Sequence, residues 1–187
     1  AFSRNMKLED TTIGWRFINP LMKAQYGVDP MPQTADNVAD DYQVSRADQD
    51  AFALRSQQRT AVAQAAGFFA EEIVPVRVAH KKGETVVEHD EHPRADTTLE
   101  ALAKLKPVNG PDKTVTAGNA SGVNDGAAAL ILASAEAVKK HGLTARARVL
   151  GMASAGVAPR VMGIGPVPAV RKLVERLGLA VTDFDVI

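Results

Sequence analysis

The most regular pattern of apolar and polar positions lies between residues 45 and 67. The positions that recur there at roughly helical spacing are mostly apolar or small, with Arg59 as the exception: Phe52, Ala53, Ser56, Arg59, Thr60, Ala63 and Ala66. Such spacing places them on one face of a helix. Ser45 with Asp48 three residues later resembles a capping box, and Gly67 follows the last of these positions. We therefore predict one long helix between Ser45 and Gly67.

Shorter elements are predicted on both sides of this helix. Capping residues, prolines and glycines mark further helices at 20–26, at 34–42 with Thr34 as cap, at 97–104, at 134–141 and at 168–178. Alternating valines on either side of the turn at Lys81–Gly83 predict a hairpin of two strands over 73–78 and 85–87. Residues 146–153 predict a buried strand. Strands and helices that alternate after residue 114 indicate an α/β layer architecture, whereas the earlier part is typical of a loop-rich α+β insertion.

Composition and charge exclude several classes of protein. The 187 residues carry 22 Lys+Arg against 22 Asp+Glu, which leaves no basic face for nucleic acid or an anionic membrane. No apolar run approaches the roughly 18 residues of a membrane span. The chain has no cysteine, which excludes disulfides, thiolate metal sites and a cysteine nucleophile within these residues. We expect a soluble, cytoplasmic protein with no nucleic-acid or membrane partner.

The densest chemical segment is the glycine-rich strip, defined here as residues 116–126. Gly118, Gly122 and Gly126 alternate with small side chains and allow another molecule to approach the backbone closely. The Ser121 hydroxyl could bond a ligand that carries amides, because small neighbours leave room for it. The alternative is structural: Asn124 or Asp125 caps a helix that begins near Gly126, and the glycines serve packing. The residue pattern leaves both interpretations open.

Other candidate sites are weaker. The glycines at 163 and 165 lack the dinucleotide spacing, and Pro166 and Pro168 lack the N–H groups that would bind a pyrophosphate. His89 and His92 lie in an acidic run that could suggest a metal, but a solvated loop is the favoured interpretation, and we expect no metal site. No histidine accompanies Ser121 in a hydrolase pattern.

Several motifs together resemble the thiolase family of acetyl-CoA C-acyltransferases. They are TVTAGNASGVNDGAAA at 114–129, SRADQDAFA at 45–53, EIVP at 72–75, KLKP at 104–107 and MGIGPVPA at 162–169. They occur in the family's order and extend over most of the chain. The first loop, residues 11–22, is similar to that of the β-ketoadipyl-CoA thiolases of aromatic-compound breakdown. Two positions depart from patterns found in some members: Pro30 replaces a histidine, and Asn109 replaces a phenylalanine beside the adenine.

The resemblance implies a fold class and a division of the chain. The class is α/β, a thiolase-like αβαβα layered fold, represented here mostly by the α+β loop domain together with parts of the two core halves. We expect a CoA-binding loop domain at 1–124, the end of the N-terminal half at 125–143 and the start of the C-terminal half at 144–187. Thiolases of this kind are homo-oligomers, so a dimer or tetramer is expected.

The resemblance also implies an activity and a set of contacts. A thiolase cleaves a 3-oxoacyl-CoA with a second CoA to acetyl-CoA and a shortened acyl-CoA, or runs the reverse condensation, through a cysteine nucleophile. CoA and acetyl-CoA are substrates, and no covalent cofactor is expected. The resemblance places Ser121, Ala117 and Ala120 against the pantetheine arm and Arg94 near the CoA nucleotide. Met31 and Met162 would line the thioester end, and no catalytic residue is assigned to this chain.

Because the chain lacks cysteine, we expect an internal fragment that supplies CoA and substrate binding and is inactive by itself. Two alternatives come from other classes. One is a non-catalytic module that binds CoA or acyl-CoA. The other is an assembly scaffold whose first loop, with Trp15 and Phe17, mediates contact between copies.

Overall fold

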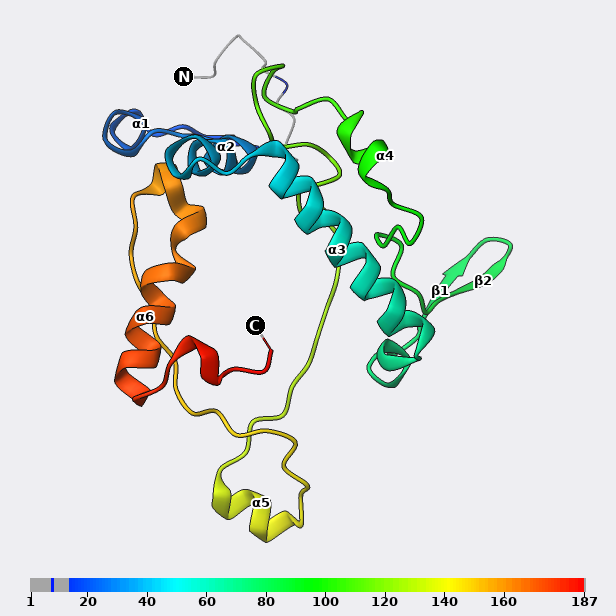
Figure 1. Ribbon diagram of the computed structural model, residues 1–187. Coiled ribbons are helices and arrows are strands. Elements are labelled where there is room, and N and C mark those ends of the chain that lie inside the picture. The colour runs from blue at the N-terminus through cyan, green and yellow to red at the C-terminus, as the bar shows by residue number, and fades with distance from the viewer. Residues whose placement is uncertain (1–7, 9–13, 187) are drawn as a thin grey trace, which may run out of the picture. The chain divides into compact units, whose positions relative to one another are not determined.

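The computed structural model describes residue 8 and residues 14–186, and most of its regular secondary structure is helical (Figure 1). The helices are α1 Pro20–Tyr26, α2 Met31–Tyr42, α3 Arg46–Ala65, α4 Leu99–Ala103, α5 Ala135–His141 and α6 Pro166–Leu177. Short 3₁₀ turns are η1 Phe68–Glu71, η2 Pro159–Ile164 and η3 Val181–Asp183. Within these residues the one sheet pairs β1 Val76–His80 with β2 Gly83–Val87.

Contacts divide the chain into two units. The first unit contains residues 1–34 and 125–187, and the second unit contains residues 35–124. The boundary falls inside α2. Each unit is described by itself, and the three-segment division expected from the sequence stays a prediction.

Local capping explains the helices that the sequence predicts well. Ser45 accepts a hydrogen bond from the Asp48 backbone N–H at 3.1 Å and donates its hydroxyl to the Asp48 carboxylate at 2.7 Å, so α3 begins where the capping box indicates. Thr98 caps α4, and Ser134 caps α5. Gly142 and Gly178 end α5 and α6 in the left-handed conformation that glycine adopts at low cost. These predictions are confirmed.

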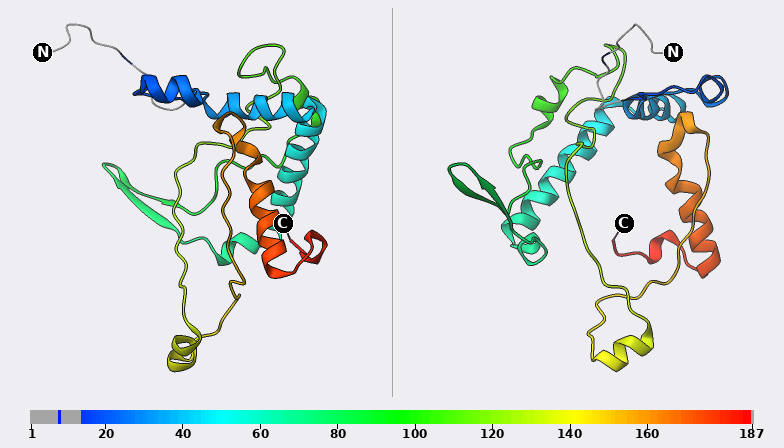
Figure 2. Two further views of the ribbon diagram at one scale, coloured as in Figure 1. Left: turned by 90° about the vertical axis from the view of Figure 1, so that its left-hand side faces the viewer. Right: turned by 180° about the vertical axis from the view of Figure 1, so that it is seen from behind.

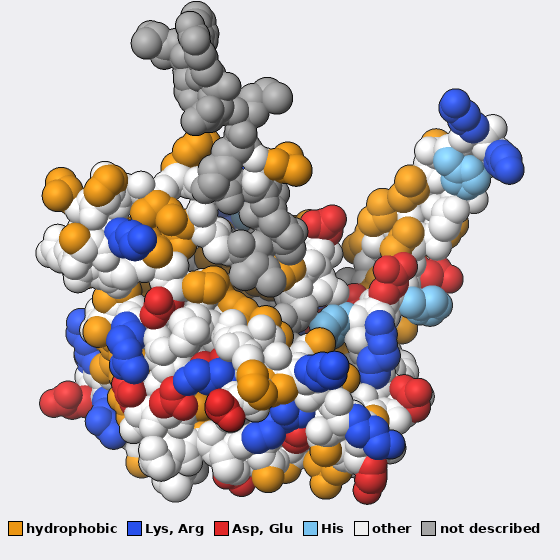
Figure 3. Space-filling model, turned by 90° about the horizontal axis from the view of Figure 1, so that it is seen from above, with side chains coloured by type: hydrophobic (Ala, Val, Ile, Leu, Met, Phe, Trp, Pro, Cys, Tyr) orange, Lys and Arg blue, Asp and Glu red, His pale blue; other side chains and the backbone are white. Residues whose placement is uncertain are grey.

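The second unit is organised around α3. Figures 1 and 2 show α4 beside α3, and the β1–β2 hairpin extends from the far end of the same helix. The predicted hairpin is confirmed, although its first strand begins three residues later than expected, and it pairs Val76 with Val87 and Val78 with Thr85. It projects at the right of Figure 3, with cationic side chains at its tip and apolar side chains along its length.

A buried carboxylate on α2 holds residues 109–115, the segment that leads into the glycine-rich strip. The side chain of Asp36 is fully buried and accepts hydrogen bonds from the Asn109 amide at 2.7 Å, from the backbone N–H and hydroxyl of Thr114 at 2.9 and 3.0 Å, and from the Val115 N–H at 3.1 Å. Burial alone would raise the pKa of Asp36, but these hydrogen bonds, Asn109 first, stabilise the ionised form more. The pKa therefore lies below its ordinary value of 3.8.

Two sequence predictions are wrong in the first unit or at its boundary, and one alternative that the sequence left open is excluded. Helix α2 begins at Met31, and Thr34 lies inside it and donates its hydroxyl to the Met31 carbonyl at 2.8 Å. Helix α6 begins at Pro166, two residues before the predicted start at Pro168. The 3₁₀ turn η2 ends at Ile164, and Gly165 connects it to α6. No helix begins near Gly126, since residues 121–134 have irregular backbone, so the capping role considered for Asn124 and Asp125 is excluded.

The predicted buried strand at 146–153 is also wrong. Its backbone is irregular and mostly exposed, and no described strand pairs with it. A strand needs a neighbour for its ladder of hydrogen bonds. Helix α6 supplies side chains instead: Arg176 donates to the Met152 carbonyl at 3.1 Å, and Lys172 donates to the Ser154 carbonyl at 3.3 Å. Gly151 lies against Leu173 and Leu177 of this helix.

The contact between Gly118 and α4 predicts a sharp effect on stability. A Cβ at residue 118 would lie 2.5 Å from Leu102 Cδ2 and 2.6 Å from Leu105 Cδ1. We expect Gly118→Ala to lower the free energy of unfolding by about 1–3 kcal/mol through overpacking. Gly126→Ala is the control, because a Cβ at Gly126 meets nothing within 4 Å. Urea unfolding measures both variants, and equal stabilities would contradict the packing argument.

The Asp36 network predicts a second effect, with a defined pH dependence. We expect Asp36→Ala to cost about 3 kcal/mol, because it leaves buried donors without an acceptor. The stabilisation is complete above the ordinary pKa of 3.8 and is lost as the pH falls through the lower value of the folded state. The wild type should therefore lose more stability on acidification than the variant.

A matched control for Asp36 lies one turn along the same helix. Asp40 accepts a hydrogen bond from the Lys113 ammonium at 2.7 Å, but half of its side chain is exposed. An exposed ion pair contributes little. Asp40→Asn should leave the free energy of unfolding nearly unchanged in urea titrations across the same pH range. An equal loss in both variants would show that burial of Asp36 has no special effect.

Candidate functional site

The first half of the glycine-rich strip is a closed turn around Thr116, which is fully buried. The Thr116 N–H donates to the Asn119 side-chain oxygen at 2.8 Å, and the Thr116 carbonyl accepts from the Ala120 N–H at 3.1 Å. The Gly118 N–H donates to the Thr116 hydroxyl at 3.2 Å. The polar side-chain and backbone groups of these five residues therefore form hydrogen bonds with one another. These bonds give the turn a defined shape without a ligand.

Asn119 ties this turn to α3. Its amide donates to the Asp50 carboxylate and to the Thr114 carbonyl, both at 3.0 Å. Asp50 is buried and also accepts a hydrogen bond from the Arg46 guanidinium at 2.8 Å. The same guanidinium donates a second hydrogen bond to the Leu102 carbonyl at 2.7 Å. The strip is thus held by a chain of charge-assisted bonds that ends on α4.

The two sides of the strip have different exposure. Gly118 and Asn119 face the packed side and are partly covered, whereas Ala117, Ala120 and Ser121 are exposed. The three residues predicted to meet pantetheine therefore lie on the accessible side. Their small size leaves backbone and the Ser121 hydroxyl open to a ligand.

Arg94 lies on a turn that is packed onto the same unit. Its Nη1 donates to the carbonyls of Glu91, His92 and Pro93 at 2.5, 3.0 and 2.9 Å, and its backbone N–H donates to the Gln57 side chain on α3 at 2.8 Å. The remaining guanidinium donors make no hydrogen bond with the described residues. The side chain is exposed, so these donors could meet an anionic group.

This turn also touches the strip, which the sequence did not indicate. A Cβ at Gly122 would lie 2.6 Å from Cε1 and 2.7 Å from Nδ1 of the His92 imidazole. The contact places the Arg94 turn next to Ser121. The sequence around His92 does not indicate this contact, because His92 and Gly122 are 30 positions apart in the sequence.

Asn109, one of the two departures from the family pattern, has an internal role. Its amide donates to Asp36, in the network that orients Thr114 and Val115. A side chain used in this way stabilises the segment that leads into the strip.

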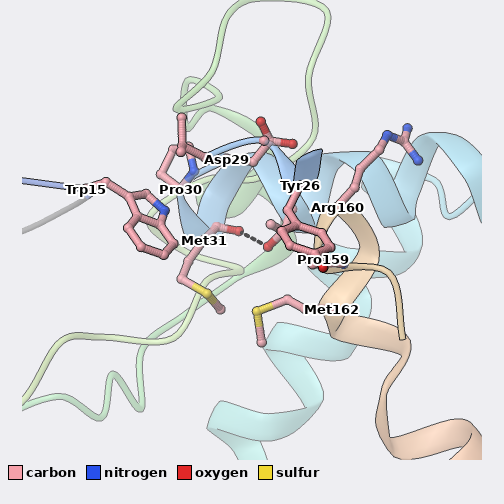
Figure 4. Close-up of a pocket in the computed structure, with 12 residues that line it drawn as sticks. Trp15, Tyr26, Asp29, Pro30, Met31, Pro159, Arg160 and Met162 are labelled. Atoms are coloured by element: carbon pink, nitrogen blue, oxygen red, sulfur yellow. Dashed lines mark hydrogen bonds between the residues drawn. The ribbon is translucent and has the colours of Figure 1, made fainter. Parts of the chain in front are cut away.

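The first unit contains a separate pocket with a volume of about 270 Å³. Its lining includes Trp15, Tyr26, Asp29, Pro30, Met31, Thr34, Pro159, Arg160 and Met162. Figure 4 shows the side chains of Met31 and Met162 directed toward each other. The structure thus brings the two methionines predicted to line a substrate pocket together. Thioether side chains adapt to ligands of irregular shape.

Other chemical groups are limited within the described ranges. No cluster of three or more His, Asp or Glu side chains that could hold a metal ion occurs among these residues. His89 lies 3.9 Å from the Glu88 carboxylate on an exposed surface. None of the described helices combines the length and apolar character that a membrane crossing requires.

Comparisons with known proteins agree on one family. The model of the thiolase N-terminal domain matches residues 4–136, and that of the thiolase C-terminal domain matches residues 143–187. The whole chain is 90% identical over 187 residues to a β-ketoadipyl-CoA thiolase of Pseudomonas putida and 83% identical to one of Pseudomonas aeruginosa. It spans about half of each, 47% of their length.

Solved structures agree. The crystal structure of the Bacillus anthracis acetyl-CoA acetyltransferase matches with a TM-score of 0.82 and 46% identity, over 85% of this chain and 40% of that one. Human mitochondrial 3-ketoacyl-CoA thiolase in complex with CoA matches with a TM-score of 0.77 and 50% identity, over 84% of this chain and 39% of that one. The predicted α/β thiolase-like fold class is confirmed. On these matches, the chain belongs to the thiolase family.

Proposed function

We propose that the whole protein is a thiolase that cleaves a 3-oxoacyl-CoA, with β-ketoadipyl-CoA as the favoured substrate, to acetyl-CoA and a shortened acyl-CoA. The observation that carries this proposal is the 90% identity to the Pseudomonas putida β-ketoadipyl-CoA thiolase along all 187 residues. The matched residues include the glycine-rich strip and the pocket lined by Met31 and Met162. The human relative that was crystallised with CoA supports CoA as a substrate.

In this proposal the chain supplies binding rather than the nucleophile. The Ser121 hydroxyl bonds an amide of the pantetheine arm, and Ala117 and Ala120 leave the arm room to lie against the backbone. Arg94 uses its remaining guanidinium donors for the phosphates of the CoA nucleotide. Met31 and Met162 enclose the thioester end. Positioning of this kind lowers the barrier because the reacting carbon is held against its nucleophile.

The chemical step uses a cysteine, and these 187 residues contain none. The nucleophile therefore has to come from another part of the whole protein. Its thiolate attacks the keto carbon, the bond to the adjacent carbon breaks, and acetyl-CoA leaves after that carbon gains a proton. The thiol of a second CoA then takes the acyl group and restores the cysteine. We further propose a cytoplasmic homo-oligomer, dimer or tetramer, with CoA thioesters as its ligands.

A chimera tests the activity. The 187 residues replace the matching 187 residues of the Pseudomonas putida β-ketoadipyl-CoA thiolase, and chromatography follows the acyl-CoA products. We expect the chimera to cleave β-ketoadipyl-CoA in the presence of CoA. A folded chimera without this activity would contradict the proposal.

The isolated 187-residue chain is the second arm of that experiment. We expect no cleavage, because the chain lacks a cysteine nucleophile. Cleavage by the isolated chain would overturn the assigned chemistry. Calorimetric binding of CoA by an inactive chimera would instead favour a CoA-binding module, and light scattering measures whether the chimera is a dimer or a tetramer.

Ser121 provides a residue-level prediction. In the chimera, Ser121→Ala should raise KM for CoA about tenfold, the effect of losing one hydrogen bond worth roughly 1.4 kcal/mol. Ser56→Ala on the exposed surface of α3 is the control and should leave KM unchanged. Steady-state thiolysis at varied CoA concentration measures both. An unchanged KM in Ser121→Ala would remove this residue from the CoA site.

A further inference from the structure

At Gly122 the glycine-rich strip contacts the turn that carries His92 and Arg94. Its φ lies outside the left-handed region, so the backbone there does not itself require glycine. A Cβ would nevertheless lie 2.6 Å from His92 Cε1 and would also collide with the Asn124 side-chain oxygen. Real Cβ atoms do not approach that closely, since packed atoms lie near their van der Waals distance. An alanine at this position therefore requires the exposed side chains of His92 and Asn124 to move.

The backbone of His92 is held by its own turn. Arg94 donates to the carbonyls of residues 91, 92 and 93, and the Arg94 N–H is bonded to Gln57 on α3 at 2.8 Å. Pro93 fixes one backbone angle between them. These bonds tie the backbone of the turn to α3. Neither ring nitrogen makes a hydrogen bond with the described residues, and the exposed ring lies next to Gly122.

We infer that His92 is a positioning residue for CoA: its imidazole supports the backbone at Gly122 and thereby sets the place of the Ser121 hydroxyl. The inference rests on the proposed function, in which Ser121 meets the pantetheine arm. It adds a residue that the resemblance did not assign. The same turn carries Arg94, so the contacts with the nucleotide end and with the pantetheine arm of CoA are coupled through one imidazole.

Substitutions of His92 in the full-length chimera test this role. We expect His92→Ala to weaken CoA binding about fivefold, a change of roughly 1 kcal/mol, with kcat nearly unchanged. His89→Ala is the matched control, since His89 lies in the same acidic loop and does not contact Gly122; it should bind CoA as the wild type does. Calorimetry gives Kd for CoA, thiolysis gives KM and kcat, and thermal unfolding gives Tm.

A rescue experiment separates positioning from a purely structural role. Gly122→Ala should weaken CoA binding about tenfold, because the added methyl displaces the backbone next to Ser121. Removing the ring in Gly122→Ala/His92→Ala should recover part of this loss. Gly122→Ala/Asn124→Ala, which removes the other neighbour, should recover less, because the inference assigns the support of Gly122 to the imidazole.

The outcomes decide the inference. Rescue by His92→Ala, with Tm within the error of the single variants, supports it. An unchanged Kd in His92→Ala, additive losses in the double variant, or greater rescue by Asn124→Ala would overturn it, as would a lower Tm without any change in Kd. Failure of the proposed function gives a different result: the wild-type chimera then binds CoA with no cleavage, and the Kd comparisons among the variants still decide the role of His92.

Discussion

Two buried carboxylates, Asp36 on α2 and Asp50 on α3, determine how the second unit is built. Each is removed from water and is stable there only because it accepts several hydrogen bonds. Most of those bonds come from residues 109–119, more than 60 positions away, so the same bonds that satisfy the carboxylates fix the strip and the segment that leads into it. Asp50 accepts one more from Arg46 on its own helix. Among the described residues no buried side-chain nitrogen or oxygen lacks a partner. Apolar burial contributes little here, since Ala39, Leu102 and Val115 are the buried apolar residues.

The helix boundaries that the sequence predicted correctly are those with local causes. Ser45, Thr98 and Ser134 cap helices through atoms three residues away, and Gly178 ends α6 through its own backbone conformation. Such interactions are visible in a short window of sequence. The failed predictions depended on partners: residues 146–153 have strand composition, but composition cannot supply the neighbouring strand that a ladder requires. Thr34 has the properties of a cap, yet α2 begins a turn earlier.

The features of the candidate site also divide into those that local sequence predicts and those that depend on distant residues. Small residues around Ser121 were recognisable because the segment combines chain flexibility with polar groups, and the structure leaves Ala117, Ala120 and Ser121 exposed. Their contacts with CoA stay a prediction. The sequence could not show that Asn119 binds Asp50, or that His92 lies on Gly122, because each contact joins distant residues. The strip's glycines illustrate this limit: they look equivalent in sequence, but Gly118 and Gly122 are packed against side chains and Gly126 faces open space.

The low pKa of Asp36 has a consequence for how binding experiments on this protein are interpreted. Its carboxyl stays ionised at any pH well above its ordinary value of 3.8, so the anchor of residues 109–115 keeps its charge throughout the neutral range. A change of ligand affinity with pH in that range therefore does not arise from release of this anchor.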